Sequence, residues 1–318
     1  MQANGLLERV RAVGQHFAEM PRRVRVVEVG PRDGLQNESL VLPTEVKARY
    51  IALLSESGLS EIEITSFVSP KRVPQLADAE ALCGQLRFSE KVRYTGLVPN
   101  RRGLERALAA GVRSVAVLAA ASETFSLRNI GMGMKEAIEE IRAICQMARP
   151  EAVRVRGYVS TAFYCPYEGR VSPMQVRAVV ESLLEIGVDE VSLADTIGHA
   201  APTDVVQLLE VLAPILPLER TAMHFHDTWG LALANVLASL ELGVATFDAA
   251  SGGAGGCPFA PGAAGNVATE DLLVLLQGMH MESDVNLAKV AEASRYLESS
   301  LGKLLPGRYL RSMMKIIS

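Results

Sequence analysis

From Val24 onward the sequence alternates short runs of β-branched or aliphatic residues with longer amphipathic stretches. This alternation is typical of parallel sheets whose strands are joined by helices. We expect eight strands, over residues 24–29, 61–65, 92–97, 114–118, 153–159, 190–193, 221–226 and 245–249. Eight such strands predict an α/β protein with a closed (β/α)8, or TIM, barrel.

Four of the predicted helices end in a glycine that comes two or three residues before the next strand: Gly58, Gly111, Gly187 and Gly243. A glycine there suits a left-handed helix cap. The alternative fold is an open doubly wound sheet, whose first helix usually begins with a Gly-rich phosphate turn. The first turn of this chain, GPRDGLQ at residues 30–36, lacks that fingerprint, so the pattern favours the barrel.

No Ser-rich, Pro-rich or low-complexity linker interrupts the alternation. We therefore expect one catalytic domain over residues 24–318, with helices after the last strand. Residues 1–23 are expected to form an N-terminal helical segment that packs beside the barrel. Apolar residues make up 49% of the 318-residue chain, which is enough for a large core without disulfides.

Composition excludes several classes of partner. The net charge is -4 and the basic residues form no stripe, so nucleic acid is not an expected partner. No apolar run approaches the ~18 residues that a membrane span requires, and no signal peptide is evident. The four cysteines form no CxxC pair, which argues against a structural zinc site or a disulfide framework. We expect a cytoplasmic protein.

Charged residues occur where predicted strands end, the position at which barrels gather their chemistry. Arg32 and Asp33 follow the first strand, and Glu63 alternates with two isoleucines, so its side chain is expected to face the lumen. An Arg-Asp dipeptide usually lies in an exposed turn with both charges solvated. The carboxylate of Glu63 in the lumen nearby favours a buried cluster instead. Asp195 ends the sixth strand, where it could belong to a site or cap the next helix.

His224 and His226 lie two residues apart on the seventh strand, so both imidazoles are expected on one face. Two histidines are half of a metal site, although a strand histidine can also be an ordinary core residue. With the carboxylate of Asp33 and an amide oxygen such as that of Asn266, the donors become two nitrogens and two oxygens. That set suits Mg²⁺ or Mn²⁺ and tolerates Zn²⁺.

Residues 252–262, after the last strand, are too rich in glycine and proline for a helix or strand. A flexible surface connection would explain them, but at the mouth of a barrel they also predict a lid. Cys257 lies within this segment. A free cysteine is commonly a small buried hydrophobe, and its place in the loop argues against that interpretation.

Six segments together resemble the 3-hydroxy-3-methylglutaryl-CoA lyase family. They are EVGPRDGLQNE (28–38), EITSFVSPK (63–71), YCPYEG (164–169), SLADTIG (192–198), HFHDTWG (224–230) and GGCPFAPGAAGNVATED (255–271). The resemblance spans the chain from about Val24 to the C-terminus. The first and last segments are specific to that family, whereas the RD turn and the HxH pair are shared with a broader superfamily of metal-dependent Claisen-type enzymes.

The resemblance implies a TIM-barrel lyase that cleaves an acyl-CoA between C2 and C3 to give acetyl-CoA and acetoacetate. It implies a homo-oligomer, a dimer or higher. Arg32 would meet the thioester carbonyl, Asp33 or His224 would be the base, and Cys257 would carry a proton. Glu63 and Asp195 match positions that members of the family use to orient site residues and to contact the substrate. The divalent cation, Mg²⁺ or Mn²⁺ with Zn²⁺ possible, would be held by Asp33, His224, His226 and Asn266.

Four positions depart from the commoner family form: Ala194 in place of glycine, Trp229 and Phe259 in place of tyrosine, and Ala264 in place of serine. None removes an implied ligand. The tail over residues 305–318 has no counterpart of the cysteine linked to redox control in the animal enzymes, so that control is not expected.

Three alternatives stay open. Lyases for longer branched 3-hydroxyglutaryl-CoA substrates belong to the same type, and the C3 substituent cannot be read from the sequence. A synthase that condenses acetyl-CoA with a 2-oxo acid would share the barrel, but Cys257 and the lack of an added regulatory domain disfavour it. A non-catalytic barrel that binds an acyl-CoA or a partner protein is disfavoured because every implied ligand is present.

Overall fold

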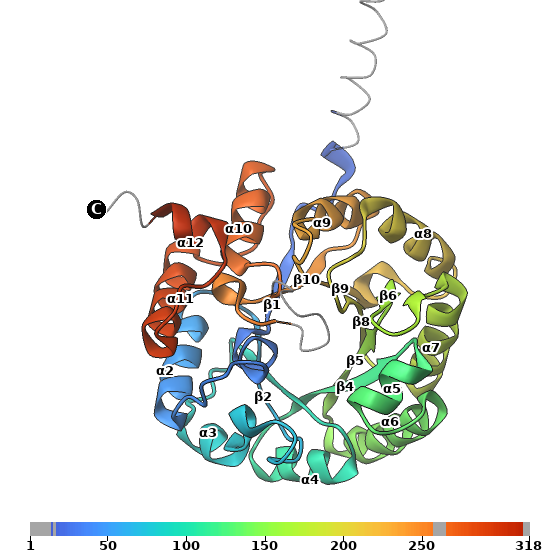
Figure 1. The fold of residues 1–318 in the computed structure, drawn as a ribbon, viewed down its shortest axis with the longest axis horizontal. Coiled ribbons are helices and arrows are strands. Elements are labelled where there is room, and N and C mark those ends of the chain that lie inside the picture. The colour runs from blue at the N-terminus through green and yellow to red at the C-terminus, as the bar shows by residue number, and fades with distance from the viewer. Residues whose placement is uncertain (1–13, 15–16, 257–264, 314–318) are drawn as a thin grey trace, which may run out of the picture.

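The computed structural model describes residues 14, 17–256 and 265–313 (Figure 1). Most of the predicted N-terminal helical segment therefore lies outside the described residues. Cys257, Phe259 and Ala264 lie outside them too.

Eight parallel strands close into a barrel, as the alternation in the sequence predicts (Figure 1). The barrel closes because β1 pairs with both β10 and β2. Each strand overlaps one of the eight predicted ranges, so the predicted fold class is confirmed. The strands are β1 (Arg25–Glu28), β2 (Glu61–Ser66), β3 (Arg93–Leu97), β4 (Ser114–Ala120), β5 (Arg154–Ser160), β8 (Glu190–Asp195), β9 (Thr221–Phe225) and β10 (Thr246–Ala249).

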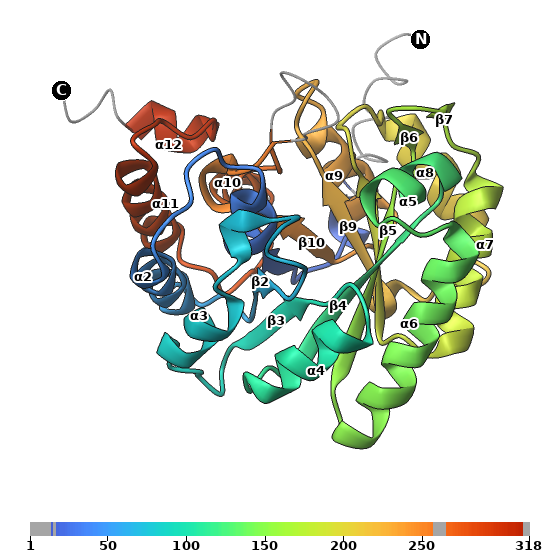
Figure 2. The same cartoon turned by 60° about the horizontal axis from the view of Figure 1, so that its bottom comes forward.

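Helices surround the strands on the outside of the barrel (Figures 1 and 2). They are α2 (Thr44–Ser55), α3 (Ala79–Gln85), α4 (Arg101–Ala109), α6 (Met134–Ala148), α7 (Pro173–Ile186), α8 (Pro202–Leu212), α9 (Ala232–Glu241) and α10 (Thr269–Gly278). The predicted cap glycines before β2, β4, β8 and β10 have φ values of 92°, 84°, 91° and 88°, which confirms their left-handed conformation.

Five further elements, three α-helices and two short strands, lie outside this alternation. Helix α5 (Glu123–Asn129) follows β4 directly, and the short hairpin of β6 (Tyr164–Cys165) and β7 (Gly169–Arg170) follows β5. The C-terminal helices α11 (Leu287–Leu301) and α12 (Arg308–Met313) come after the eighth barrel helix, and α11 packs against α2. Among the described residues, no helix is both long and apolar enough to cross a bilayer.

The lumen of the barrel is polar at the amino-terminal ends of the strands. Glu61 and Glu190 are both buried there and form ion pairs with three arginines from β1, β3 and β5: Arg25, Arg93 and Arg154. Each of the two carboxylates has at least two arginine partners, which compensate its buried charge. This charged layer occupies the amino-terminal end of the lumen. The cavity lies at the opposite end, where the strands finish.

Candidate active site

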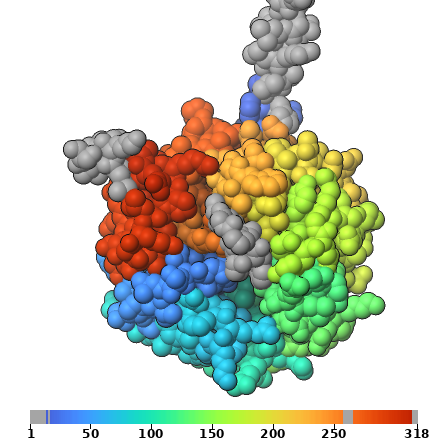
Figure 3. Space-filling model, in the orientation of Figure 1, coloured from blue at the N-terminus to red at the C-terminus, as the bar shows by residue number. Residues whose placement is uncertain are grey.

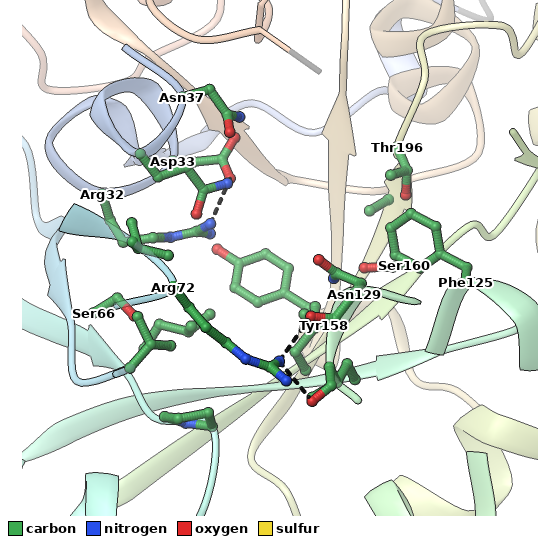
Figure 4. A pocket seen from close by; sticks show the side chains of 18 of the residues that line it. Arg32, Asp33, Asn37, Ser66, Arg72, Phe125, Asn129, Tyr158, Ser160 and Thr196 are labelled. Carbon is green, nitrogen blue, oxygen red and sulfur yellow. Dashed lines mark hydrogen bonds and ion pairs between the residues drawn. The ribbon is translucent and has the colours of Figure 1, made fainter. Parts of the chain in front are cut away.

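A cavity of about 850 Å³ opens among the carboxyl ends of the strands. The space-filling view is hollowed near the centre of this face (Figure 3). Arg32, Asp33, Arg72 and Asn129 line the cavity (Figure 4). His224 on β9 and His226, just after that strand, line it too. Its place at the carboxyl ends of barrel strands is the usual one for an active site.

The turn after β1 positions two of the predicted site residues. Residues Gly30–Gly34 form one π-helical turn, in which the amides of Arg32, Asp33 and Gly34 all donate to the carbonyl oxygen of Val29. A Cβ atom at Gly30 would come within 2.5 Å of a carboxylate oxygen of Glu28, so this turn requires glycine. The fixed backbone directs Arg32 and Asp33 toward the barrel axis.

Arg32 is held from two sides. Its Nε donates to Oε1 of Glu63 over 2.5 Å, and its Nη1 pairs with Asp33. The hydroxyl of Tyr158 donates to the other oxygen of Glu63 over 2.5 Å, which fixes that carboxylate. Burial alone would lower the pKa of Arg32, but Glu63 and Asp33 hold that pKa well above its usual value. The predicted buried cluster of Arg32, Asp33 and Glu63 is therefore confirmed, with a permanent positive charge.

Asp33, His224 and His226 meet in one buried group. The two Nε2 atoms are 3.2 Å apart, and Oδ2 of Asp33 lies 3.9 Å from the first and 3.7 Å from the second. Two nitrogens bound to one cation at ~2.1 Å lie roughly 3.0–3.4 Å apart, so the spacing fits a shared metal ion. Burial would raise the pKa of Asp33, but Arg32 and both imidazoles hold it well below its usual range.

Asn266 completes the predicted donor set. Its Nδ2 donates to Oδ2 of Asp33 over 2.9 Å and to the carbonyl of Ala254 over 3.1 Å. Its Oδ1 is buried and has no hydrogen-bond partner among the described residues, and the same holds for Nδ1 of His226. A buried oxygen without a donor is costly, so Asn266 Oδ1 is suited to a cation. The residues present fit the predicted divalent metal.

Asp195 lies at the end of β8, as the sequence predicts. Its two oxygens accept the backbone amides of His199 over 3.1 Å and Ala200 over 3.0 Å, so it fixes the turn after β8. Burial raises its pKa to about 6. Its neighbours Ala194 and Thr196 line the cavity, whereas Asp195 is not among the lining residues. The predicted contact of Asp195 with substrate stays a prediction.

Three polar residues of the lumen were not predicted from the sequence, namely Arg156, Tyr158 and Asp248. Arg156 donates to Asp248 through both Nη atoms, and Asp248 lies 3.1 Å from Nδ1 of His224. All three alternate with apolar residues along β5 and β10. The period-two argument that placed Glu63 in the lumen could have found them.

A family model described as HMGL-like matches residues 23–297. The chain belongs to the HMGL-like family. It is 48% identical over 285 residues to the 3-hydroxy-3-methylglutaryl-CoA lyase, cytoplasmic, of Danio rerio, covering 90% of this chain and 85% of that protein.

Two solved structures extend this family relationship to the fold. The hydroxymethylglutaryl-CoA lyase of Pseudomonas aeruginosa superposes with a TM-score of 0.91 at 46% identity, over 93% of this chain and 99% of that one. The HMG-CoA lyase of Acinetobacter baumannii, solved with coenzyme A and 3-methylmalate, superposes with a TM-score of 0.88 at 39% identity, over 91% of this chain and 95% of that one.

Proposed function

We propose that this HMGL-like protein is a carbon–carbon lyase that cleaves (S)-3-hydroxy-3-methylglutaryl-CoA to acetyl-CoA and acetoacetate. The observation that carries the proposal is the placement of Arg32 beside the group of Asp33, His224 and His226 at one end of the cavity. The names of the relatives at 39–48% identity support the choice of substrate.

We propose Asp33, His224, His226 and Asn266 as the ligands of a divalent cation, Mg²⁺ or Mn²⁺ with Zn²⁺ tolerated. When bound, such a cation lowers the pKa of an alcohol that it contacts and neutralises nearby negative charge. Nitrogen and oxygen donors in this proportion do not select one ion by themselves. Oδ1 of Asn266, which is buried and has no hydrogen-bond partner among the described residues, supports the assignment of Asn266. Nε2 of His226, which faces Asp33 and His224, supports that of His226.

The proposed reaction begins with loss of the proton from the C3 hydroxyl, for which Asp33 and His224 are the candidate bases. His224 can take the proton only while its Nε2 is free of the cation. The C2–C3 bond then breaks, and its electron pair moves to C2 and the thioester carbonyl. Acetoacetate leaves, and the enolate of acetyl-CoA remains.

The guanidinium of Arg32 neutralises the negative charge that grows on the thioester oxygen. Its hydrogen bond to Glu63, which Tyr158 fixes in turn, orients the guanidinium for this role in a buried site. Cys257 then protonates C2 of the enolate, in a role that rests on the family resemblance alone. Glu63 orients Arg32, and we propose that Asp195 orients substrate indirectly by fixing the turn between Ala194 and Thr196.

We propose one catalytic unit over residues 24–318 that works in the cytoplasm as a homo-oligomer. The cysteines described by the structure, Cys83, Cys145 and Cys165, are free and buried, as is usual in a reducing compartment.

The test is a screen of the purified protein against CoA thioesters of 3-hydroxyglutarates with different C3 substituents, with acetyl-CoA release as the measured product. The 3-methyl compound is expected to have the highest kcat/KM. Preference for a longer branched substituent would transfer the proposal to that substrate. Consumption of a 2-oxo acid with acetyl-CoA, without lyase activity, would replace it with the condensing alternative.

A further inference from the structure

Asp248 on β10 touches a proposed metal ligand from behind. It is buried, with an exposed fraction of 1%, and its Oδ2 lies 3.1 Å from Nδ1 of His224. The opposite ring nitrogen, Nε2, is the one that faces His226 and Asp33. The two strands bring the pair together in register, because Asp248 and His224 are partners in the β9–β10 ladder.

The other contacts of Asp248 decide which atom carries the proton in this pair. Arg156 donates from Nη2 to Oδ1 over 2.6 Å and from Nη1 to Oδ2 over 3.1 Å, and Ser192 donates to Oδ2 over 3.0 Å. A carboxylate paired in this way accepts hydrogen bonds and donates none. Nδ1 of His224 must therefore be the donor, and in the neutral ring, which is the form that binds a metal, the lone pair is then on Nε2.

We propose that Asp248 is a positioning residue that fixes the ring and tautomer of His224 and so presents the Nε2 lone pair to the divalent cation. The inference rests on the proposed metal site. Carboxylates that accept from the distal nitrogen of a histidine ligand commonly have this effect.

The support for Asp248 extends across the barrel. Nε of Arg156 donates to Glu190 over 2.6 Å, and its Nη1 donates to the hydroxyl of Tyr158 over 2.7 Å. Arg156 is fully buried, so this chain from Glu190 to His224 has little freedom to move. His226 differs, because its Nδ1 has no hydrogen-bond partner in the described part of the chain. The fixed geometry of the ligand pair therefore depends on His224 and, through it, on Asp248.

The test compares two isosteric substitutions of buried lumen carboxylates, Asp248→Asn and Glu61→Gln. Glu61 is as buried as Asp248 and pairs with Arg25, Arg93 and Arg154, but it touches no proposed ligand. Calorimetric titration of Mn²⁺ into metal-free protein is expected to show a Kd about 10- to 100-fold higher for Asp248→Asn. Glu61→Gln is expected to lower Tm and to leave the Kd within about twofold.

A second readout reports the tautomer directly. In ¹⁵N-labelled, metal-free wild-type protein, His224 is expected to show a protonated Nδ1 and an unprotonated Nε2 by NMR, and Asp248→Asn is expected to show a mixture. Ser192→Ala removes one donor to Asp248 without touching His224, so it should raise the Kd by a smaller factor; it provides the test if Asp248→Asn does not fold.

An unchanged Mn²⁺ affinity and tautomer in Asp248→Asn, or in Ser192→Ala if that variant must stand in, would overturn the inference. An affinity loss in Glu61→Gln as large as in Asp248→Asn would do so as well, because the effect would then be one of stability. Neither readout uses a substrate. A protein that binds Mn²⁺ through this pair but cleaves no thioester would thus contradict the proposed function and leave the positioning role of Asp248 standing.

Discussion

Arg32 and Glu63 are joined by a hydrogen bond of 2.5 Å from Nε of the guanidinium to Oε1 of the carboxylate. The turn that carries Arg32 is fixed by Val29, and the carboxylate of Glu63 is fixed by Tyr158. The guanidinium is thus oriented before any substrate arrives. A preorganised buried cation stabilises a developing oxyanion more than it stabilises the ground state.

Arg32→Gln is accordingly expected to lower kcat by about 10²- to 10³-fold with a modest change in KM. Arg32→Lys should recover part of the loss, because lysine keeps the charge but lacks the planar fork that Glu63 and a substrate oxygen can share. Single-turnover rate, Tm and metal content should be measured on the same preparation. A fall of all three in step would instead mean that Arg32 neutralises Asp33 and Glu63 and keeps the turn folded.

Removal of divalent cations is expected to abolish turnover, and Mg²⁺ or Mn²⁺ should restore it, since Asp33, His224 and His226 meet in one buried group. His226→Ala should weaken metal binding by ~10-fold or more, because a direct ligand should matter at least as much as its supporting partners.

His199→Ala is the matched control for this variant. His199 stacks on Trp229 at 3.8 Å and is not a member of the group that could hold a metal, so its loss should leave metal affinity unchanged. Full activity in verified metal-free protein would contradict the metal requirement.

Cys257→Ser should lower kcat much more than it raises KM, because a serine hydroxyl of far higher pKa is a poor proton donor at neutral pH. Alkylation should inactivate the wild-type enzyme, and a bound product analogue should slow the inactivation. Cys83→Ala is the control, since burial raises the pKa of that thiol to about 12 and makes it unreactive. Near-normal kcat in the serine variant would show that the thiol is not the proton donor.

The strands and the histidine pair could be predicted because both depend on the two-residue periodicity of side chains along a strand, which is a local property of the sequence. The bond between Asn266 and Asp33 joins residues 233 positions apart, and spacing alone does not reveal such a contact. Asn266 was one candidate amide among others, and the resemblance assigned it to the metal site. The contact between Asp248 and His224 depends on the register of β9 and β10, which the barrel closure sets and the pattern of each strand does not.

Glu28 allows a prediction about stability and pH. It is buried at the end of β1, where Oε1 accepts the amides of Gly30 over 2.9 Å and Ser251 over 2.8 Å, and Oε2 accepts the hydroxyl of Thr269 over 2.7 Å. It therefore ties the turn of Arg32 to the segment after β10. Burial is the main cause that raises its pKa from 4.5 to about 7, and the neighbouring Glu270 adds to the rise.

Between about pH 4.5 and pH 7, the folded protein thus retains a proton on Glu28 that the unfolded chain has lost. Its contribution to stability is complete below about pH 4.5 and is lost as the pH rises through about 7. Within that window the free energy of unfolding should fall with rising pH by at most about 1.4 kcal/mol per unit from this group. Glu28→Gln keeps the shape and removes the proton exchange, so its stability should depend less on pH.

Urea unfolding of wild-type protein and Glu28→Gln at pH 5, 6, 7 and 8 measures this difference. The free energy of unfolding of the wild type, relative to the variant, should decrease from pH 5 to 7 and level off by pH 8. Glu139→Gln changes an exposed carboxylate, with 69% of its side chain accessible, and should leave the wild-type pH dependence intact. Parallel curves for wild type and Glu28→Gln would show that Glu28 is ionised in the folded protein throughout this range, and that its three donors outweigh the cost of its burial.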